Sequence, residues 1–290
     1  MKRTILIAVT LVVSMMSTYG ARDKVIYGED DRRDIKDVTN LNYLNMAKST
    51  AAMISNNSIS FDGDVATISG STLGSRRNLC ASEPFRDQLA SANCSGFLVA
   101  PDVLVTAGHC IRSQFSCDSY AWVFDYAVTG TKTEHTVAKN SVYKCKSIIK
   151  QVLDRGTMDD FAVIKLERVV SDREPAQVRL EGKVEDFAPL VVIGHPSGLP
   201  TKVADGANVR NNNNDYYFVS NLDTYGGNSG SAVFNVDTGM VEGILVRGET
   251  DYVRRGGCTV SNTCTNEGCR GEDVTRITNI PGLKDIISAQ

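Results

Sequence analysis

The sequence predicts an all-β fold, because short apolar runs rich in β-branched residues are separated by turn residues and no long helix lies between them. The predicted strands are Gly96–Val99, Val103–Thr106, Ala121–Val128, Phe161–Leu166, Leu190–Ile193, Tyr216–Ser220, Ser231–Phe234 and Val241–Val246. Turn signals such as Pro101-Asp102 and Asp237-Thr238-Gly239 punctuate these runs. Residues Ile280 to Ala289 predict a closing helix, with Pro281 near its first turn.

The first twenty residues have the pattern of a cleaved signal peptide. Lys2 and Arg3 form a charged start, Thr4 to Met16 is an uncharged and mostly apolar run, and small residues precede Ala21. The alternative is a membrane anchor, but the run is shorter than the roughly 20 residues that span a bilayer. We therefore expect a signal peptide at 1–20 and a secreted chain, extracellular or periplasmic, with no membrane partner after cleavage.

The remainder divides into a polar N-terminal segment and a β-rich domain. The segment at 21–79 is charged and can include a short propeptide, and the domain at 80–290 contains the predicted strands. Within the segment, Val25-Ile26-Tyr27 is strand-like and Leu41 to Ile54 has a weak helical period. No linker rich in Gly, Ser or Pro separates further domains.

Composition excludes some functions. Hydrophobic residues make up 42% of the 290 residues, which is enough for a full core, and the net charge is only −3. A nucleic-acid binder would need a basic face, so no nucleic-acid partner is expected. We expect a monomer.

The eight cysteines all lie after the predicted signal peptide, and an even number in an exported chain indicates disulfides. They are Cys80, Cys94, Cys110, Cys117, Cys145, Cys258, Cys264 and Cys269. Cys258, Cys264 and Cys269 lie close together in the sequence, so a metal site is the alternative to disulfides there. Their spacing, however, does not match the common zinc patterns. We expect no metal and no cofactor.

The chain has only three histidines, so a catalytic base can be sought among few candidates. His135 lies in a polar stretch and is expected at the surface. His195 precedes Pro196 in a Gly-rich turn, where a structural role is expected. His109 follows the apolar run Val103–Thr106 and adjoins Cys110.

Three motifs resemble the signatures of chymotrypsin-like serine proteases. They are Thr106-Ala107-Gly108-His109-Cys110, Asp160-Phe161-Ala162-Val163-Ile164 and Gly226-Gly227-Asn228-Ser229-Gly230-Ser231. They occur in the order His, Asp, Ser that this fold requires. The resemblance covers roughly residues 80 to 285 and implies two six-stranded antiparallel β-barrels, a trypsin-like fold, with the catalytic residues at their interface.

The resemblance implies a role for each motif residue. His109 would be the general base and then the acid, Asp160 the orienting carboxylate and Ser229 the nucleophile. Asp159 is the competitor for the carboxylate role. The backbone N–H groups of Gly227 and Ser229 would form the oxyanion hole. The family's histidine-loop disulfide would join Cys94 to Cys110.

A closer resemblance is to the bacterial glutamyl endopeptidases. It depends on Val25-Ile26 followed by Asp31-Arg32, on the turn Gly194-His195-Pro196-Ser197-Gly198 and on the nucleophile loop. The chain departs from trypsins at Asn228, where trypsins have an Asp that binds the new N-terminal ammonium. It also carries Arg247 where the family has a Trp on the strand that pairs with substrate backbone.

Specificity depends on the pocket for the substrate side chain. The resemblance places Asp223 at the pocket floor, six residues before Ser229, with Thr224 and Gly248 also binding substrate. The strand Gly243–Val246 lacks the His that helps glutamyl endopeptidases bind a carboxylate. We therefore predict cleavage after Arg or Lys. The alternatives are a Glu-specific enzyme, a solvent-facing turn role for Asp223, and an inactive protease-like binding protein.

Maturation is expected to remove the signal peptide after Gly20. A second cut after Lys24 would expose Val25, the residue that resembles the mature start of glutamyl endopeptidases. The alternatives are that Ala21 stays the terminus, or that cleavage follows the dibasic pair Arg76-Arg77.

Overall fold

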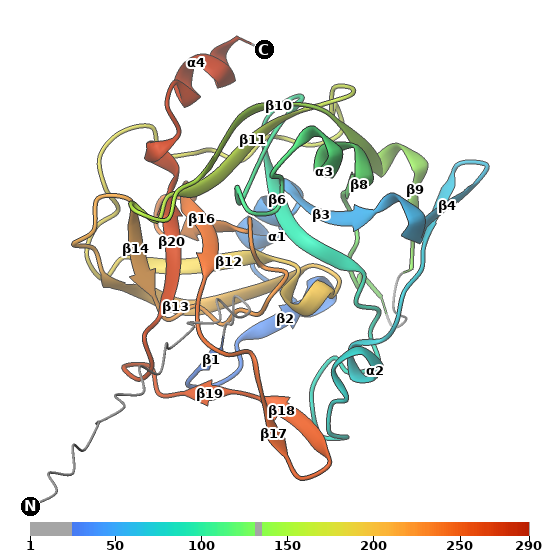
Figure 1. Ribbon diagram of the computed structural model, residues 1–290, viewed down its shortest axis with the longest axis vertical. Coiled ribbons are helices and arrows are strands. Elements are labelled where there is room, and N and C mark those ends of the chain that lie inside the picture. Colours follow the sequence, from blue (N-terminus) through green and yellow to red (C-terminus); the bar gives the residue numbers. More distant parts are fainter. Residues whose placement is uncertain (1–24, 131–134, 290) are drawn as a thin grey trace, which may run out of the picture.

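Two antiparallel β-barrels packed against each other form the body of the protein (Figure 1). The computed structural model describes residues 25–130 and 135–289. The predicted all-β fold with two six-stranded barrels is confirmed. The predicted signal peptide, residues 1–20, lies outside the described residues.

The first barrel is closed, and its strands are ordered β10-β11-β7-β6-β3-β8. Every neighbouring pair is antiparallel. The strands are β3 (Thr50–Ser55), β6 (Ala92–Ala100), β7 (Val103–Thr106), β8 (Tyr120–Val123), β10 (Val142–Leu153) and β11 (Asp160–Leu166).

The second barrel follows the order β12-β15-β16-β20-β14-β13 and closes where β12 pairs with β13. Strand β2 (Arg32–Asp34) adds to the free edge of β13. The six barrel strands are β12 (Pro189–Gly194), β13 (Lys202–Asn211), β14 (Tyr217–Ser220), β15 (Ala232–Asn235), β16 (Val241–Arg247) and β20 (Glu272–Arg276).

Smaller elements lie around the barrels. A three-stranded sheet contains β4 (Ile59–Asp62), β5 (Val65–Ile68) and β9 (Thr136–Ala138). Strand β17 (Tyr252–Arg255) pairs with β18 (Cys258–Ser261). Strand β1 (Ile26–Tyr27) runs parallel to β19 (Thr263–Cys264). The helices are α1 (Leu41–Ala47), α2 (Leu73–Arg77), α3 (Gln114–Ser119) and α4 (Leu283–Ser288), with 3-10 turns η1 (Ile35–Asp37), η2 (Asn56–Ser58), η3 (Lys139–Ser141), η4 (Pro196–Gly198) and η5 (Ile277–Asn279).

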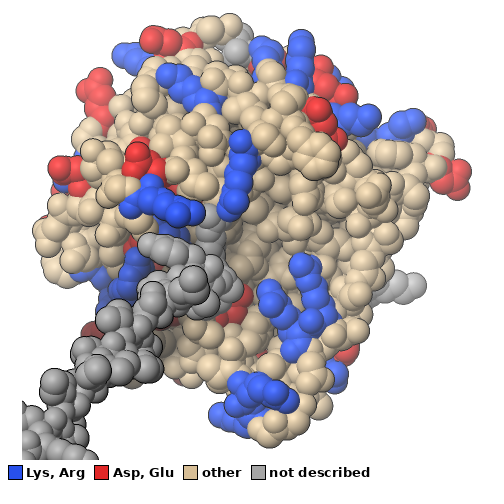
Figure 2. All heavy atoms as spheres, in the orientation of Figure 1, with Lys and Arg blue, Asp and Glu red and all other residues tan. Residues whose placement is uncertain are grey.

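None of the helices within 25–130 and 135–289 is long and apolar enough to cross a membrane. Figure 2 shows that charged side chains of both signs lie in small groups on the face seen in Figure 1, with uncharged atoms across much of its centre. This mixed surface agrees with the small net charge of −3.

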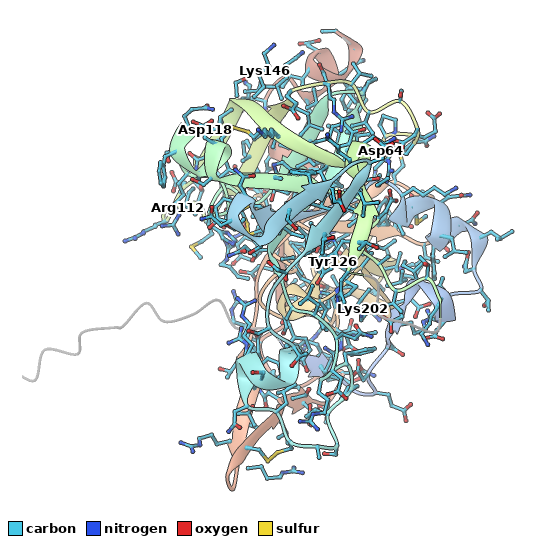
Figure 3. The ribbon with its side chains drawn as sticks, turned by 90° about the vertical axis from the view of Figure 1, so that its right-hand side faces the viewer. Asp64, Arg112, Asp118, Tyr126, Lys146 and Lys202 are labelled. Atoms are coloured by element: carbon cyan, nitrogen blue, oxygen red, sulfur yellow. A yellow bond between two sulfur atoms is a disulfide. The ribbon has the colours of Figure 1, made fainter. Side chains whose placement is uncertain are left out.

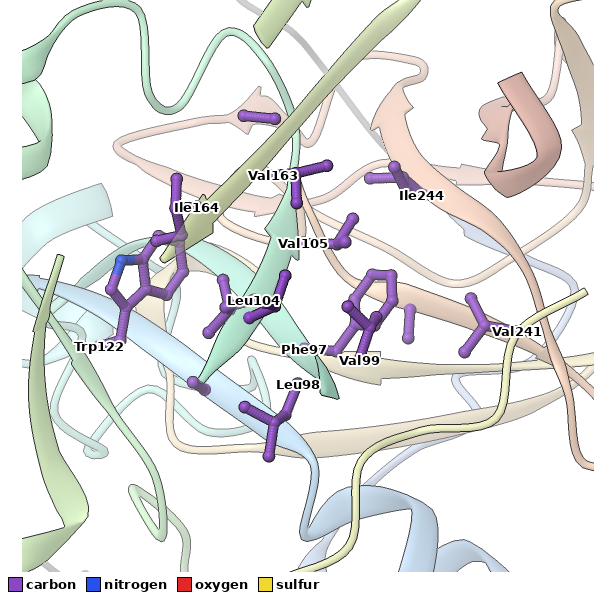
Figure 4. Packing of buried hydrophobic residues seen from close by; sticks show 14 of the residues in the cluster. Phe97, Leu98, Val99, Leu104, Val105, Trp122, Val163, Ile164, Val241 and Ile244 are labelled. Atoms are coloured by element: carbon purple, nitrogen blue, oxygen red, sulfur yellow. The ribbon is translucent and has the colours of Figure 1, made fainter. Parts of the chain in front are cut away.

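The main hydrophobic core extends from the first barrel into the second. Phe97 and Val99 of β6 lie between Val105 of β7 and Val241 of β16 (Figure 4). A separate cluster fills the interior of the second barrel. Because the shared core includes strands from both barrels, it fixes the position of one barrel against the other.

The helical period expected over Leu41 to Ile54 is only partly right. Helix α1 ends at Ala47, and strand β3 begins at Thr50. In β3, Met53 packs in the main core while Ile54 packs in a second cluster on the opposite face. Because only two residues separate α1 from β3, the apolar residues of the two elements read in the sequence as one continuous weak period.

Residues before position 80 contribute to both barrels. Strand β3 is one of the six strands of the first barrel, and β2 pairs with β13 of the second. Lys202 Nζ lies 2.5 Å from Asp34 Oδ1, and burial lowers the pKa of Lys202 to about 8. Figure 3 shows Lys202 and Tyr126 deep in the molecule. A buried ion pair thus anchors the N-terminal segment.

Four disulfides connect all eight cysteines: Cys80–Cys258, Cys94–Cys110, Cys117–Cys145 and Cys264–Cys269. A chain with this many disulfides belongs in an oxidising environment, extracellular or periplasmic. The cysteines considered above as a metal cluster are all in disulfides, so they offer no thiolate ligand.

Candidate active site

His109 and Asp160 meet where two paired strands of the first barrel end. Strand β7 pairs with β11 so that Thr106 is opposite Ala162, which places the residues after β7 beside the start of β11. Asp160 is almost fully buried and its Oδ2 accepts a hydrogen bond from His109 Nδ1 at 2.8 Å. Its Oδ1 accepts from the backbone N–H of His109 at 2.9 Å. A carboxylate can only accept, so the proton lies on Nδ1 and Nε2 has its lone pair available.

The competing carboxylate, Asp159, has other partners. Its Oδ1 accepts a hydrogen bond from Asn279 Nδ2 at 3.2 Å, and its backbone carbonyl accepts from Asp154 N at 2.9 Å. Burial raises the pKa of Asp159. The geometry therefore pairs His109 with Asp160 and directs Asp159 toward the turn that precedes α4.

Ser229 lies in the loop between β14 and β15 of the second barrel, and residues of the first barrel hold that loop. The backbone N–H of Ser95, on β6, donates to Ser229 O at 2.8 Å, and Ser95 Oγ donates to Gly227 O at 2.8 Å. Cys110 Sγ lies 3.7 Å from Ser229 O. Because Cys110 follows His109 directly in the chain, these contacts bring the three predicted triad residues to the junction of the two barrels.

The loop around Ser229 also positions two backbone N–H groups. Neither Gly227 N nor Ser229 N donates to another residue of the described chain. Gly227 has a φ of +104°, a conformation that glycine adopts without strain. The loop is fixed from outside, because Ser197 N donates to Gly226 O at 2.6 Å. Two N–H groups held in one loop are the arrangement that an oxyanion hole requires.

Asn228 and the N-terminal segment have separate hydrogen-bond partners. Asn228 is buried, and its Oδ1 accepts a hydrogen bond from Ser231 Oγ at 3.2 Å. Val25 is fully buried beside Thr224, whose backbone N–H donates to Val25 O at 3.3 Å. The N-terminal segment therefore contacts Thr224, in the stretch of chain that precedes the nucleophile loop.

Asp223, predicted at the pocket floor, is 3% exposed and faces the N-terminal segment. One carboxylate oxygen accepts from Tyr27 N at 2.7 Å and the other from Asp31 N at 2.8 Å. Burial raises the pKa of Asp223 to about 7, although both hydrogen bonds act in the opposite direction. The solvent-facing alternative does not agree with this burial.

A second buried carboxylate, Glu272, contacts the other two predicted pocket residues. Thr224 Oγ1 donates to Glu272 Oε2 at 2.6 Å, and the Glu272 carboxylate lies against Gly248. Sequence reasoning missed this residue because β20, which begins at Glu272, was not predicted as a strand. The pattern Asp273-Val274-Thr275-Arg276 is too polar to indicate a barrel strand, and only its pairing with β16 shows its position.

Arg247 is placed between buried acids. Its Nε donates to Asp273 Oδ2 at 2.9 Å, and its guanidinium lies 4.0 Å from Asp160 Oδ2. Its charge also lies over the ring of Tyr217, 5.5 Å from the centroid. Arg247 thus contributes positive charge near the carboxylate that orients His109.

The other two histidines lie outside this cluster. His195 is fully buried, its Nδ1–H donates to Leu199 O at 3.0 Å, and burial lowers its pKa to about 3. His135 is exposed. Both placements agree with the roles expected from the sequence.

Comparisons with known proteins find a matching family model and a solved structure of similar fold. A family model described as a trypsin-like peptidase domain matches residues 94–244, slightly more than half of the chain. A Glu endopeptidase, solved in complex with MPD, has a TM-score of 0.54 at 18% identity, covering 92% of this chain and 100% of that one. Rv3671c from M. tuberculosis H37Rv, in an inactive form, has a TM-score of 0.48 at 13% identity, covering 92% and 98%. No curated protein sequence matches the chain significantly.

Proposed function

The chain belongs to the trypsin-like peptidase family, and from this premise we propose that it is a serine endopeptidase that cleaves polypeptides through an acyl-enzyme. The observation that carries the proposal is the pairing of His109 Nδ1 with the buried carboxylate of Asp160 at 2.8 Å. This contact fixes the imidazole tautomer that leaves Nε2 ready to accept a proton.

In the proposed mechanism Ser229 attacks the carbonyl of the scissile bond. His109 takes the proton of the Ser229 hydroxyl and then gives it to the leaving amine. Asp160 stays ionised and stabilises the imidazolium that forms. Water repeats the sequence on the acyl-enzyme and releases the product acid.

The backbone N–H groups of Gly227 and Ser229 would bind the oxyanion of the tetrahedral intermediate. These donors act on charge that appears only in the transition state, so they accelerate the chemical step more than they tighten substrate binding. The contacts of Ser95 with this loop hold the donors in place.

An inactive binding protein is the alternative from another class. Such proteins usually lose a triad residue, whereas His109, Asp160 and Ser229 are all present. The ordered hydrogen bonds of His109 also favour an enzyme, since a binding protein has no need of a fixed tautomer.

We propose that the enzyme prefers Arg or Lys before the scissile bond. Two buried carboxylates, Asp223 and Glu272, flank Thr224. Negative charge at the base of a pocket attracts a cationic side chain and repels an anionic one. The strand Gly243–Val246 also contains no histidine to assist a substrate carboxylate.

The N-terminal segment favours the alternative of a Glu-specific enzyme. The similarity to a Glu endopeptidase concerns the fold only, but Val25 does contact Thr224. If the ammonium that a cut after Lys24 creates at Val25 docked beside Asp223, its charge would neutralise that carboxylate and favour an anionic substrate side chain.

The test is a set of matched peptide substrates that differ only in the residue before the scissile bond. We expect kcat/KM for Arg and Lys to exceed that for Glu by more than tenfold, and Ser229→Ala to hydrolyse none of them measurably. A preference for Glu would support the alternative. Hydrolysis that persists in Ser229→Ala would contradict the proposed mechanism.

We further propose that the chain is secreted after loss of residues 1–20, that 21–79 includes a short processed segment, and that it acts as a monomer. The four disulfides support export.

A further inference from the structure

Glu272 occupies the space between the two segments that bind substrate in the proposed pocket. It begins β20, is fully buried, and pairs in register with Ser220 of β14. One carboxylate oxygen accepts from Thr224 Oγ1 at 2.6 Å, and the other accepts from the backbone N–H of Glu249 at 3.3 Å. The carboxylate therefore connects the segment before Ser229 with the segment after β16.

Gly248 shows how closely the carboxylate approaches the pocket wall. A Cβ at this position would overlap both carboxylate oxygens of Glu272. Glycine at 248 is thus what allows the acid to extend between the two segments. Thr224 and Gly248, two residues that the sequence assigns to substrate binding, both contact Glu272.

Asp223 and Glu272 both have hydrogen bonds to each carboxylate oxygen, but Asp223 faces the N-terminal segment, whereas Glu272 faces both segments of the proposed pocket. Both of its carboxylate oxygens are directed at backbone N–H groups of the N-terminal segment, those of Tyr27 and Asp31. Its raised pKa, about 7, also means that close to neutral pH a large part of the population is uncharged. Asp223 therefore anchors the N-terminal segment.

Tyr27 provides a polar group next to Glu272. Its ring is buried, and its hydroxyl has no hydrogen-bond partner within the described part of the chain. Burial raises the pKa of Tyr27, and the negative charge of Glu272 raises it further. The hydroxyl can accept a hydrogen bond from an incoming cationic group.

We propose that Glu272, rather than Asp223, is the acid that selects Lys or Arg at the substrate residue before the scissile bond. The inference rests on the proposed function, because it assigns the specificity of that same site. A substrate ammonium or guanidinium that reaches Thr224 and Gly248 lies next to this carboxylate, whereas a substrate carboxylate there faces a like charge.

The test compares Glu272→Gln with Asp223→Asn, both of which keep the side-chain shape and remove the charge. The readout is the ratio of kcat/KM for an Arg substrate to kcat/KM for a matched norleucine substrate. Enzyme concentration is set by titrating Ser229 with an uncharged phosphonylating reagent. For Glu272→Gln we expect this ratio to fall by about 30- to 3000-fold, and for Asp223→Asn we expect a much smaller fall.

An unchanged ratio in Glu272→Gln, or a larger fall in Asp223→Asn, would overturn the assignment. If Glu272→Gln yields no titratable enzyme, Glu272→Asp keeps the charge and withdraws it by one methylene. Hydrolysis of Lys and Arg substrates should then fall while that of norleucine is retained, and equal effects on all three would count against Glu272. A wild-type enzyme that prefers Glu also refutes this inference, whereas one that hydrolyses no peptide refutes the proposed function itself.

Discussion

At the scale of single residues, four of the buried carboxylates near the site differ in the donors that they face. Asp160 faces an imidazole and a backbone N–H, Asp159 the amide of Asn279, Asp223 two backbone N–H groups, and Glu272 a hydroxyl and a backbone N–H. These partners decide their proposed roles, since the carboxyl group itself is the same. The proposed triad could be named from the sequence because its motifs are local in sequence. Glu272 could not, because only strand pairing brings it to Thr224.

The choice between the neighbouring acids gives a direct prediction. Asp160→Asn should lower kcat by about 10⁴-fold, because the amide no longer fixes the tautomer of His109. The matched variant Asp159→Asn should stay within a few-fold of wild type, since Asp159 contacts Asn279. Initial rates on one peptide substrate measure both, and near-normal turnover in Asp160→Asn would move the carboxylate role to Asp159.

His195 predicts a pH dependence of stability. Burial lowers its pKa to about 3 in the folded protein, against an ordinary value near 6.5, so the unfolded chain binds a proton that the folded one does not. Its contribution to the free energy of unfolding is complete above pH 6.5 and falls as the pH decreases toward 3. The loss is at most about 1.4 kcal/mol per pH unit.

The control is His195→Asn, which keeps a donor for Leu199 O and cannot titrate. The difference in unfolding free energy between wild type and this variant, from urea titrations at pH 7, 6, 5 and 4, should move in favour of the variant as the pH decreases. A difference that does not change with pH would show that His195 is not held neutral by burial.

At the scale of elements, most of the apolar barrel strands were predictable, β3 being the exception, and several polar ones were not. The runs that became β7, β11, β15 and β16 were recognised because all or nearly all of their residues are buried. Strands β10, β13 and β20 were missed. In β10 exposed and partly buried positions dominate its second half, and β20 buries charged residues through pairing. The periodicity of apolar residues in the sequence does not show that a buried charged residue has a partner on a neighbouring strand.

The disulfides connect elements at different chain distances, so their contributions to stability should differ. Cys80 and Cys258 are 178 residues apart, whereas Cys264 and Cys269 are 5 apart. Loop-closure entropy predicts a loss of about 5 kcal/mol when the first pair is replaced by Ser and about 2 kcal/mol for the second. Urea unfolding of the two double variants measures this, and equal losses would contradict the entropic account.

At the scale of the whole molecule, the N-terminal segment connects the two barrels and the site. Strand β3 completes the first barrel, β2 extends the second, and β1 pairs with β19 while Tyr27 N binds Asp223. In the sequence this stretch is polar and charged, and the partners of Arg33 and Asp34, which are Asp205 and Lys202, lie far away in the chain. Its role in the fold could be seen only from the paired strands.

This arrangement predicts where maturation stops. A cut after Lys24 leaves the buried residues Val25 to Tyr27 in place, whereas a cut after Arg77 separates β3 from the rest of its barrel. N-terminal sequencing of fully active enzyme should therefore give Val25. A start at Ala21 would show that the second cut is not needed, and an active enzyme that starts at residue 78 and lacks the preceding peptide would contradict the described role of β3.

The central claim is that Ser229 is a nucleophile activated by His109. The most direct measurement is the reaction of the purified protein with an uncharged phosphonylating reagent, followed by intact mass and peptide mapping. We predict one adduct per molecule, located on Ser229, that is absent in Ser229→Ala and forms at least about a thousand-fold more slowly in His109→Ala. The account would be contradicted if Ser229 of the processed protein stayed unmodified and if every triad variant kept its activity.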